Sequence, residues 1–80
     1  METRIGAVII LVEAEGNIER INRVITEHSG MILGRQGIPL RERGTNIISL
    51  VLEGDTDMIG SITGKLGRMP GVKVKSVLAG

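Results

Sequence analysis

The stretch from Asp55 to Leu78, DTDMIGSITGKLGRMPGVKVKSVL, decides the fold of this chain. Its first half has apolar residues at helical spacing behind an acidic start, which predicts an amphipathic helix beginning near Asp55. Pro70 and Gly71 end that helix, because proline cannot continue it and glycine readily adopts the turn that follows. Apolar and polar residues then alternate from Val72 to Leu78, as in a strand with one buried face. A helix followed at once by such a strand is half of a split βαβ unit.

The other half of this unit lies upstream. Residues 4–13 are apolar on both faces and predict a central strand, after which Asn17 is suited to cap a helix over residues 18–28. Residues 31–40 contain a proline and a polar middle, which are features of an edge strand. Residues 46–53 are again apolar on both faces and predict a second central strand.

These elements follow one another in the order βαββαβ. Two right-handed split units give a ferredoxin-like α+β fold, with an antiparallel sheet of strand order 4-1-3-2 and both helices on one face. The pattern is consistent, because the first and third strands are apolar on both faces while the second and fourth are more polar. The sequence therefore predicts a single domain over residues 1–80.

The composition restricts the possible functions. A chain of 80 residues has a thin core of its own, so help from another subunit is plausible. A net charge of +1 provides no strong field toward nucleic acid or anionic lipid. The absence of cysteine excludes disulfides and thiolate chemistry and is typical of a cytoplasmic protein. The longest apolar run, Ile5 to Val12, is too short to span a bilayer, so no membrane association is predicted.

The predicted fold leaves one sheet face without helices. That face exposes about half of the apolar residues of the central strands, a larger patch than a soluble monomer usually tolerates. We therefore expect a homo-oligomer, either a dimer or a tetramer, with Val8 and Ile10 at its interface. A second contact is expected at Gly60 and Gly64, which fall away from the buried stripe of the second helix and each cost about 1 kcal/mol relative to alanine. An irregular helix near Gly67 is the alternative explanation.

The whole frame resembles a known family. The segments 54–60, 64–67 and 70–75 in particular are similar to those of the small, single-domain iron-only hydrogenase system regulators, which are related to ACT domains and to the C-terminal domain of the nickel-responsive repressor. The resemblance covers nearly the whole chain. It implies a ferredoxin-like, oligomeric regulatory module. Because no catalytic arrangement is found, we expect a non-catalytic regulator that senses a small ligand or binds a protein partner, with an indirect effect on transcription.

The resemblance also suggests candidate site residues. ACT domains bind small effectors around a glycine in the first strand–helix turn, and Gly16 has this place between Glu15 and Asn17. Arg35 is added as a ligand-binding candidate, because an arginine in the middle of a strand needs a carboxylate or ligand. The nickel-responsive repressor uses several histidines and a cysteine, whereas this chain has His28 alone, so no metal site is predicted within one chain and no cofactor is expected.

Other kinds of site are poorly matched. The segment 60–65 lacks the spacing of a phosphate-binding loop, and 64–67 matches the GXXG of RNA binders but precedes a strand. No arrangement of serine, histidine and acid predicts an enzyme. Direct DNA binding is not expected, because no recognition helix remains. The alternative function is nucleic-acid binding across the assembled sheet, which would weaken steeply with salt. It would use the basic residues Arg35, Arg41, Arg43, Lys73 and Lys75.

Overall fold

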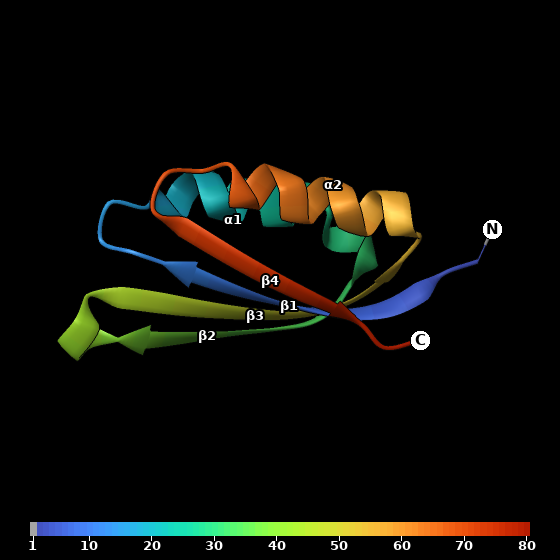
Figure 1. Cartoon of the computed structure of the whole chain (residues 1–80), viewed down its shortest axis with the longest axis horizontal. Coiled ribbons are helices and arrows are strands. Elements are labelled where there is room, and N and C mark those ends of the chain that lie inside the picture. Colours follow the sequence, from blue (N-terminus) through green and yellow to red (C-terminus); the bar gives the residue numbers. More distant parts are fainter. Residues whose placement is uncertain (1) are drawn as a thin grey trace.

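The computed structural model of the chain describes residues 2–80 and has the element order βαββαβ. The strands are β1 (Arg4–Val12), β2 (Ile32–Leu40), β3 (Thr45–Gly54) and β4 (Val72–Leu78), the helices are α1 (Ile18–Glu27) and α2 (Thr56–Gly67), and two short 3-10 turns are η1 (Ser29–Met31) and η2 (Arg41–Arg43). The sheet is antiparallel with the order β2-β3-β1-β4, and both helices cover one of its faces (Figure 1). This confirms the predicted ferredoxin-like fold.

The pairing register aligns the middles of the four strands. Ile9 on β1 lies beside Ser49 on β3 and beside Lys75 on β4, and Ser49 lies beside Gln36 on β2. Directly paired residues point to the same face of a sheet. Lys75, Ile9, Ser49 and Gln36 therefore form a row across the sheet, which we call the central row.

The core lies between the sheet and the two helices. The strands and helices contribute only aliphatic side chains and methionines to it, since the chain has no aromatic residue. Its fully buried large side chains are Val8, Ile10, Val12, Ile21, Leu50, Leu52, Ile62 and Leu66. Among the described residues, no polar or charged side chain is buried.

Val8 and Ile10 require a correction. Both were expected at an interface, but both are 0% exposed beneath the helices. The two faces of β1 are equally apolar in sequence, so the alternation of residues did not determine which face the helices would cover. Ile5 and Ile9 alternate with the buried residues along β1 and point to the other face of the sheet, so they remain available to another molecule.

Both helices begin at the side-chain caps that the sequence predicts. The Oδ1 of Asn17 accepts a hydrogen bond from the amide of Arg20 at 3.1 Å, and the Oδ1 of Asp55 accepts one from the amide of Met58 at 2.8 Å. These bonds satisfy amides that lack a partner within the first helical turn. They fix where each helix starts, and therefore how it lies on the sheet.

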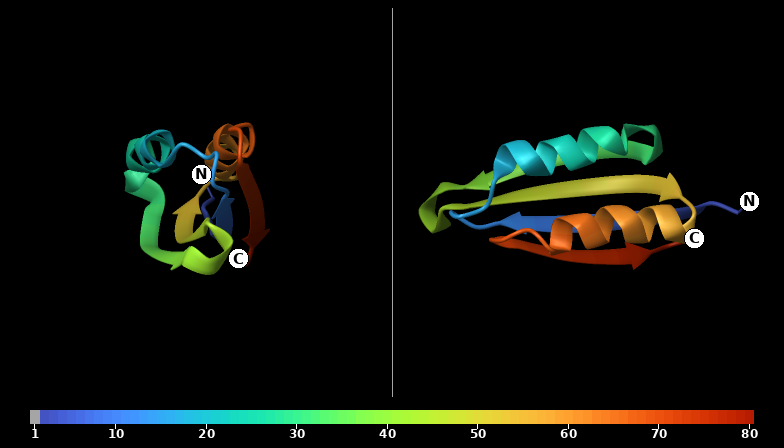
Figure 2. Two further views of the ribbon diagram at one scale, coloured as in Figure 1. Left: turned by 90° about the vertical axis from the view of Figure 1, so that its left-hand side faces the viewer. Right: turned by 90° about the horizontal axis from the view of Figure 1, so that it is seen from above.

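The helices divide the covered face between them. Figure 2 shows α2 on the side of β4 and α1 on the side of β2. The turn η2, at the tip of the β2–β3 hairpin, lies at the end of the molecule opposite to both chain termini (Figure 1). Within residues 2–80, neither helix has the length and apolar character needed to cross a membrane.

Candidate functional site

The sheet face turned away from the helices is the main candidate surface, and we call it the open face. Several of its large aliphatic side chains are exposed: Ile9 and Val51 on the central strands are each 43% exposed, and Ile38 on the neighbouring edge strand is 41% exposed, whereas Leu11 and Ile47 are half-buried. By the pairing register, the open face carries Ile5, Ala7, Ile9, Leu11, Gly34, Gln36, Ile38, Leu40, Ile47, Ser49, Val51, Glu53, Lys73, Lys75 and Val77. An apolar strip thus crosses β1, β3 and β2 without cover from this chain.

Charged residues surround this strip unevenly. Lys73 and Lys75 stand along the outer strand β4, and the hairpin turn adds Arg41 and Arg43 at the same end of the sheet as Lys73. The opposite end of the open face carries Glu53, whose Oε2 accepts a hydrogen bond from the Oγ1 of Thr3 at 3.2 Å. The hairpin end of the sheet therefore carries cations together with the carboxylates of Glu13 and Glu42, and the end near the chain termini carries the carboxylate of Glu53.

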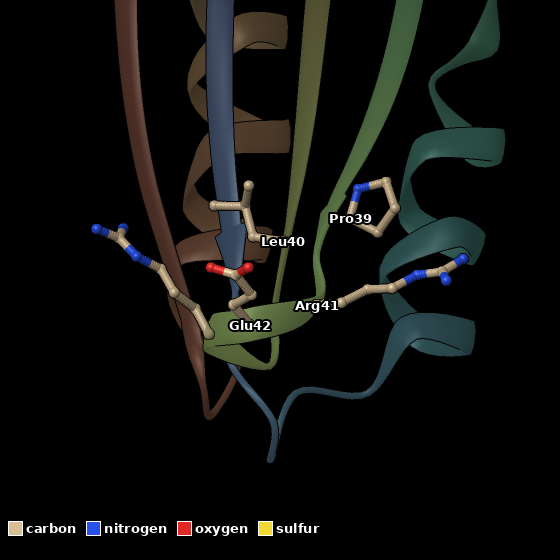
Figure 3. Close-up of a pocket in the computed structure, with 5 residues that line it drawn as sticks. Pro39, Leu40, Arg41 and Glu42 are labelled. Atoms are coloured by element: carbon tan, nitrogen blue, oxygen red, sulfur yellow. The ribbon is translucent and has the colours of Figure 1, made fainter.

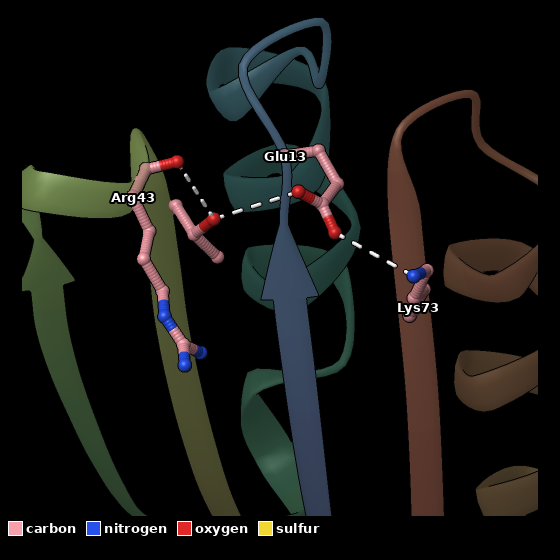
Figure 4. A network of polar contacts seen from close by, with 4 residues as sticks. Glu13, Arg43 and Lys73 are labelled. Carbon is pink, nitrogen blue, oxygen red and sulfur yellow. Dashed lines mark hydrogen bonds and ion pairs between the residues drawn. The ribbon is translucent and has the colours of Figure 1, made fainter.

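A small polar network ties the strands together at the hairpin end of the sheet (Figure 4). The Oε1 of Glu13 lies 3.7 Å from the Nζ of Lys73, and its Oε2 accepts a hydrogen bond from the Oγ1 of Thr45 at 3.4 Å. The same hydroxyl lies 3.4 Å from the carbonyl oxygen of Arg43. Glu13 thereby joins the end of β1 to the starts of β3 and β4. Sequence reasoning missed this network, because it depends on which strand ends become neighbours.

The hairpin tip also forms a depression of about 590 Å³, lined by residues 39–43. Figure 3 shows the side chains of Pro39 and Arg41 toward α1, while Leu40 and Glu42 extend over the strands. Among residues 2–80, neither Arg41 nor Arg43 forms an ion pair with a carboxylate. The depression therefore combines apolar walls with two guanidinium groups and the carboxylate of Glu42.

The predicted ligand turn, Glu15-Gly16-Asn17, packs closely against the loop between α2 and β4. A β-carbon on Gly16 would lie 2.5 Å from Cγ1 of Val12, and one on Gly71 would lie 2.7 Å from Cγ of Glu15. The amide of Glu13 donates to the carbonyl oxygen of Gly71 at 2.8 Å. The glycine in this turn therefore has a packing role, whatever else the turn binds.

Arg35 lies on the helix-covered side, apart from the open face. It pairs with Leu50, which points into the core, and its Nη2 donates a hydrogen bond to the Oδ1 of Asn22 on α1. The structure therefore separates Arg35 from Lys73 and Lys75. The five basic residues considered for nucleic-acid binding do not share one face.

The remaining candidates lie on the helices. The Nδ1 of His28 lies 2.8 Å from the carbonyl oxygen of Val24, to which it donates a hydrogen bond, and no group of three potential metal ligands occurs within residues 2–80. Gly60 lies on the exposed surface of α2, where a β-carbon would meet nothing within 4 Å. At Gly64 a β-carbon would lie 3.1 Å from Nη2 of Arg68, the mobile end of a long side chain. A contact role for these two glycines stays a prediction.

These features define a class of protein: a small ferredoxin-like α+β domain with one face of its sheet sealed by helices and the other left apolar and open. Residues 4–76 match the TM1266-like family, described as "Iron-only hydrogenase system regulator, putative", and the chain belongs to this family. The resemblance stated from the sequence is thereby confirmed.

Solved structures agree with this assignment. The uncharacterized protein TM1266 from Thermotoga maritima is 41% identical, with a TM-score of 0.94 over 99% of this chain and 100% of that one. The de novo designed protein Foldit4 is 13% identical, with a TM-score of 0.54 over 99% of this chain and 100% of its own, and shows a likeness of fold alone. No curated protein matches the chain.

Proposed function

We propose that this chain is a non-catalytic regulatory module of an iron-only hydrogenase system and that it works in the cytoplasm as a homo-oligomer. The family description supports the link to the hydrogenase system. The observation that carries the rest is the open face, where large aliphatic side chains of the central strands remain exposed. Apolar patches of this kind in water mark sites of contact with another molecule.

The polar network around Glu13 is suited to stabilising the fold. Glu13, Thr45 and Lys73 connect three strand ends through a surface ion pair and a long hydrogen bond. Regulation is then exerted through contacts: a small effector or a protein partner binds the assembled module and changes what the module binds next. Any effect on transcription is indirect in this scheme.

The proposal is tested by deleting the gene in its host and measuring transcripts and hydrogen evolution of the iron-only hydrogenase. We expect both to change and to return when the wild-type gene is supplied on a plasmid. A strain with unaltered hydrogenase transcripts and activity under inducing and non-inducing conditions would contradict the proposed function.

Nucleic-acid binding is the second candidate, and one observation favours it. Arg41, Arg43 and Lys73 lie at the same end of the sheet, and Lys75 follows on the same strand face. Against it, Glu13 already lies beside Lys73, and Arg35 lies on the other side of the sheet. The net charge of +1 leaves little long-range attraction for phosphates.

A further inference from the structure

We propose that the open face is the contact surface of a two-fold dimer. In this dimer each strand lies over the same strand of the second copy and runs in the opposite direction. The inference rests on the proposed function, because it specifies the homo-oligomer that the function requires. The molecule that covers the open face is a second copy of this chain. The two-fold axis runs along the central row of Lys75, Ile9, Ser49 and Gln36.

The open face is large enough for a stable dimer. The nine residues of β1 and the four strands of the sheet give a footprint of about 30 Å by 19 Å, or roughly 570 Å², from the usual spacings of strands. Two such faces bury about 1,100 Å², which passes the roughly 1,000 Å² expected of a specific interface. The face therefore needs nothing larger than another copy to cover it.

The chemistry of the open face suits a copy of itself. Its middle is aliphatic, with Ile9, Val51 and Ile38 projecting, and such side chains interdigitate between two stacked sheets. Its charged groups stand at the rim and ends, where water still reaches them. Gln36, at the β2 end of the central row, has both donors and an acceptor, so two copies of its amide can bond to each other.

The distribution of charge selects the direction of the axis. The hairpin end carries Arg43 and Lys73 with the carboxylates of Glu13 and Glu42 beside them, whereas the opposite end of the open face carries the carboxylate of Glu53. An axis along the strands would place the two hairpin ends over each other and bring the two Glu53 carboxylates together at the other end. An axis along the central row reverses the ends, so that the Arg43 end of one copy lies over Glu53 of the other.

The same axis specifies which residues meet. Ser49 and Ile9 lie near the axis and face their own equivalents, while Ile47 lies over Val51 of the second copy. The two Lys75 ammonium groups approach each other at the outer strand, where solvent and salt screen their repulsion.

The first test changes the middle of the open face. Ile9→Lys adds a positive charge at the axis in both copies, beside Lys75 of the same sheet, and the dissociation constant of the dimer should rise about 100-fold or more because unpaired like charges become buried. Met58→Lys is the matched control, since Met58 is 46% exposed but lies on α2, on the other side of the sheet. Sedimentation velocity over a dilution series measures the constant, and far-UV circular dichroism checks the fold. Ile9→Lys with unchanged assembly overturns the proposal.

The second test measures the direction of the axis and does not depend on the first variant folding. The chain has no cysteine, so single cysteines can be placed at will. In the proposed dimer the two copies of residue 75 are about 10 Å apart, whereas those of residue 73 are about 17 Å apart, from the usual spacings of sheets and residues. A short bismaleimide should therefore cross-link Lys75→Cys and leave Lys73→Cys largely monomeric on a denaturing gel.

The outcomes separate this inference from the proposed function. Efficient cross-linking of Lys73→Cys, or a wild-type chain that stays monomeric at high concentration and needs another protein or a nucleic acid to cover the open face, overturns the two-fold dimer. A hydrogenase phenotype in the deletion strain would still uphold the regulatory role. Conversely, the predicted cross-linking of the cysteine variants would uphold the dimer even if the deletion strain had no hydrogenase phenotype. That combination of results would contradict the proposed function alone.

Discussion

Gly71 lies so close to Gly16 that a β-carbon on Gly71 would stand 2.8 Å from the backbone nitrogen of Gly16. The two glycines let the β1–α1 turn and the α2–β4 turn touch through their backbones, where the amide of Glu13 also donates to the carbonyl of Gly71. Each split βαβ unit contributes one of these turns. Their contact therefore joins the two halves of the fold at the same end as the Glu13 network.

Gly71→Ala should be strongly destabilising. Its φ of 73° is left-handed, which costs an ordinary residue about 1–2 kcal/mol, and the added methyl group has no room. Gly44→Ala is the matched control, because Gly44 has a similar φ of 64° but a β-carbon there meets nothing within 4 Å. We expect losses of about 3 kcal/mol or more at Gly71 and about 1–2 kcal/mol at Gly44 in urea unfolding followed by circular dichroism. Equal losses would show that the close approach carries no cost.

The double variant Gly60→Ala/Gly64→Ala should make the domain more stable. A regular helix gains about 1 kcal/mol for each such replacement, with a smaller gain at Gly64 because Arg68 must shift. If these glycines contact another molecule, the variant also loses that association, while the open-face dimer is unchanged because α2 lies on the other side of the sheet. Greater stability with every association intact would remove the contact role.

Asp55→Ala should cost about 1 kcal/mol of unfolding free energy, because the amide of Met58 loses its cap. Asp55→Asn keeps an accepting oxygen and should cost less. Asp57→Ala provides the control within the same turn, since it removes an acidic residue that does not form the cap. Thermal unfolding of the three variants under one buffer condition ranks them. A loss at Asp57 as large as that at Asp55 would contradict the capping role.

The purified protein should not bind duplex DNA in a sequence-specific manner at physiological salt. Its net charge is +1, its basic residues are divided between two sides of the sheet, and both helices are committed to the core. An electrophoretic mobility shift that appears at low salt should disappear as salt rises. Selective binding that survives physiological salt would favour a direct repressor over the proposed module.

Much of the fold could be predicted because local signals agreed with one another. Asn17 and Asp55 predicted where the helices begin, and Pro70 with Gly71 predicted the last turn. The apolar character of both faces of β1 and β3 predicted that these strands lie in the middle of the sheet. Each of these signals acts over a few residues along the chain, so it can be read without the tertiary structure.

The candidate site was less predictable, because it depends on contacts between distant residues. Val8 and Ile9 are both aliphatic neighbours in one strand, and only the docking of the helices makes the first buried and the second exposed. Glu13 and Lys73 are separated by most of the chain, and their ion pair follows from the pairing of β1 with β4. The packing role of Gly16 likewise appears only when Gly71 is placed beside it.

The edge position of β2 has a consequence for the motions of the chain. This strand is bonded to a neighbour on one side only, contains a bulge between Ile32 and Gly34, and is exposed over residues 33–39. The strand β1 is bonded on both sides and lies over the core. Amide hydrogens of β2 should therefore exchange with solvent through local opening, while those of β1 exchange only when the whole domain unfolds. Local stability therefore falls from the central strand β1 to the edge strand β2, which carries the hairpin tip.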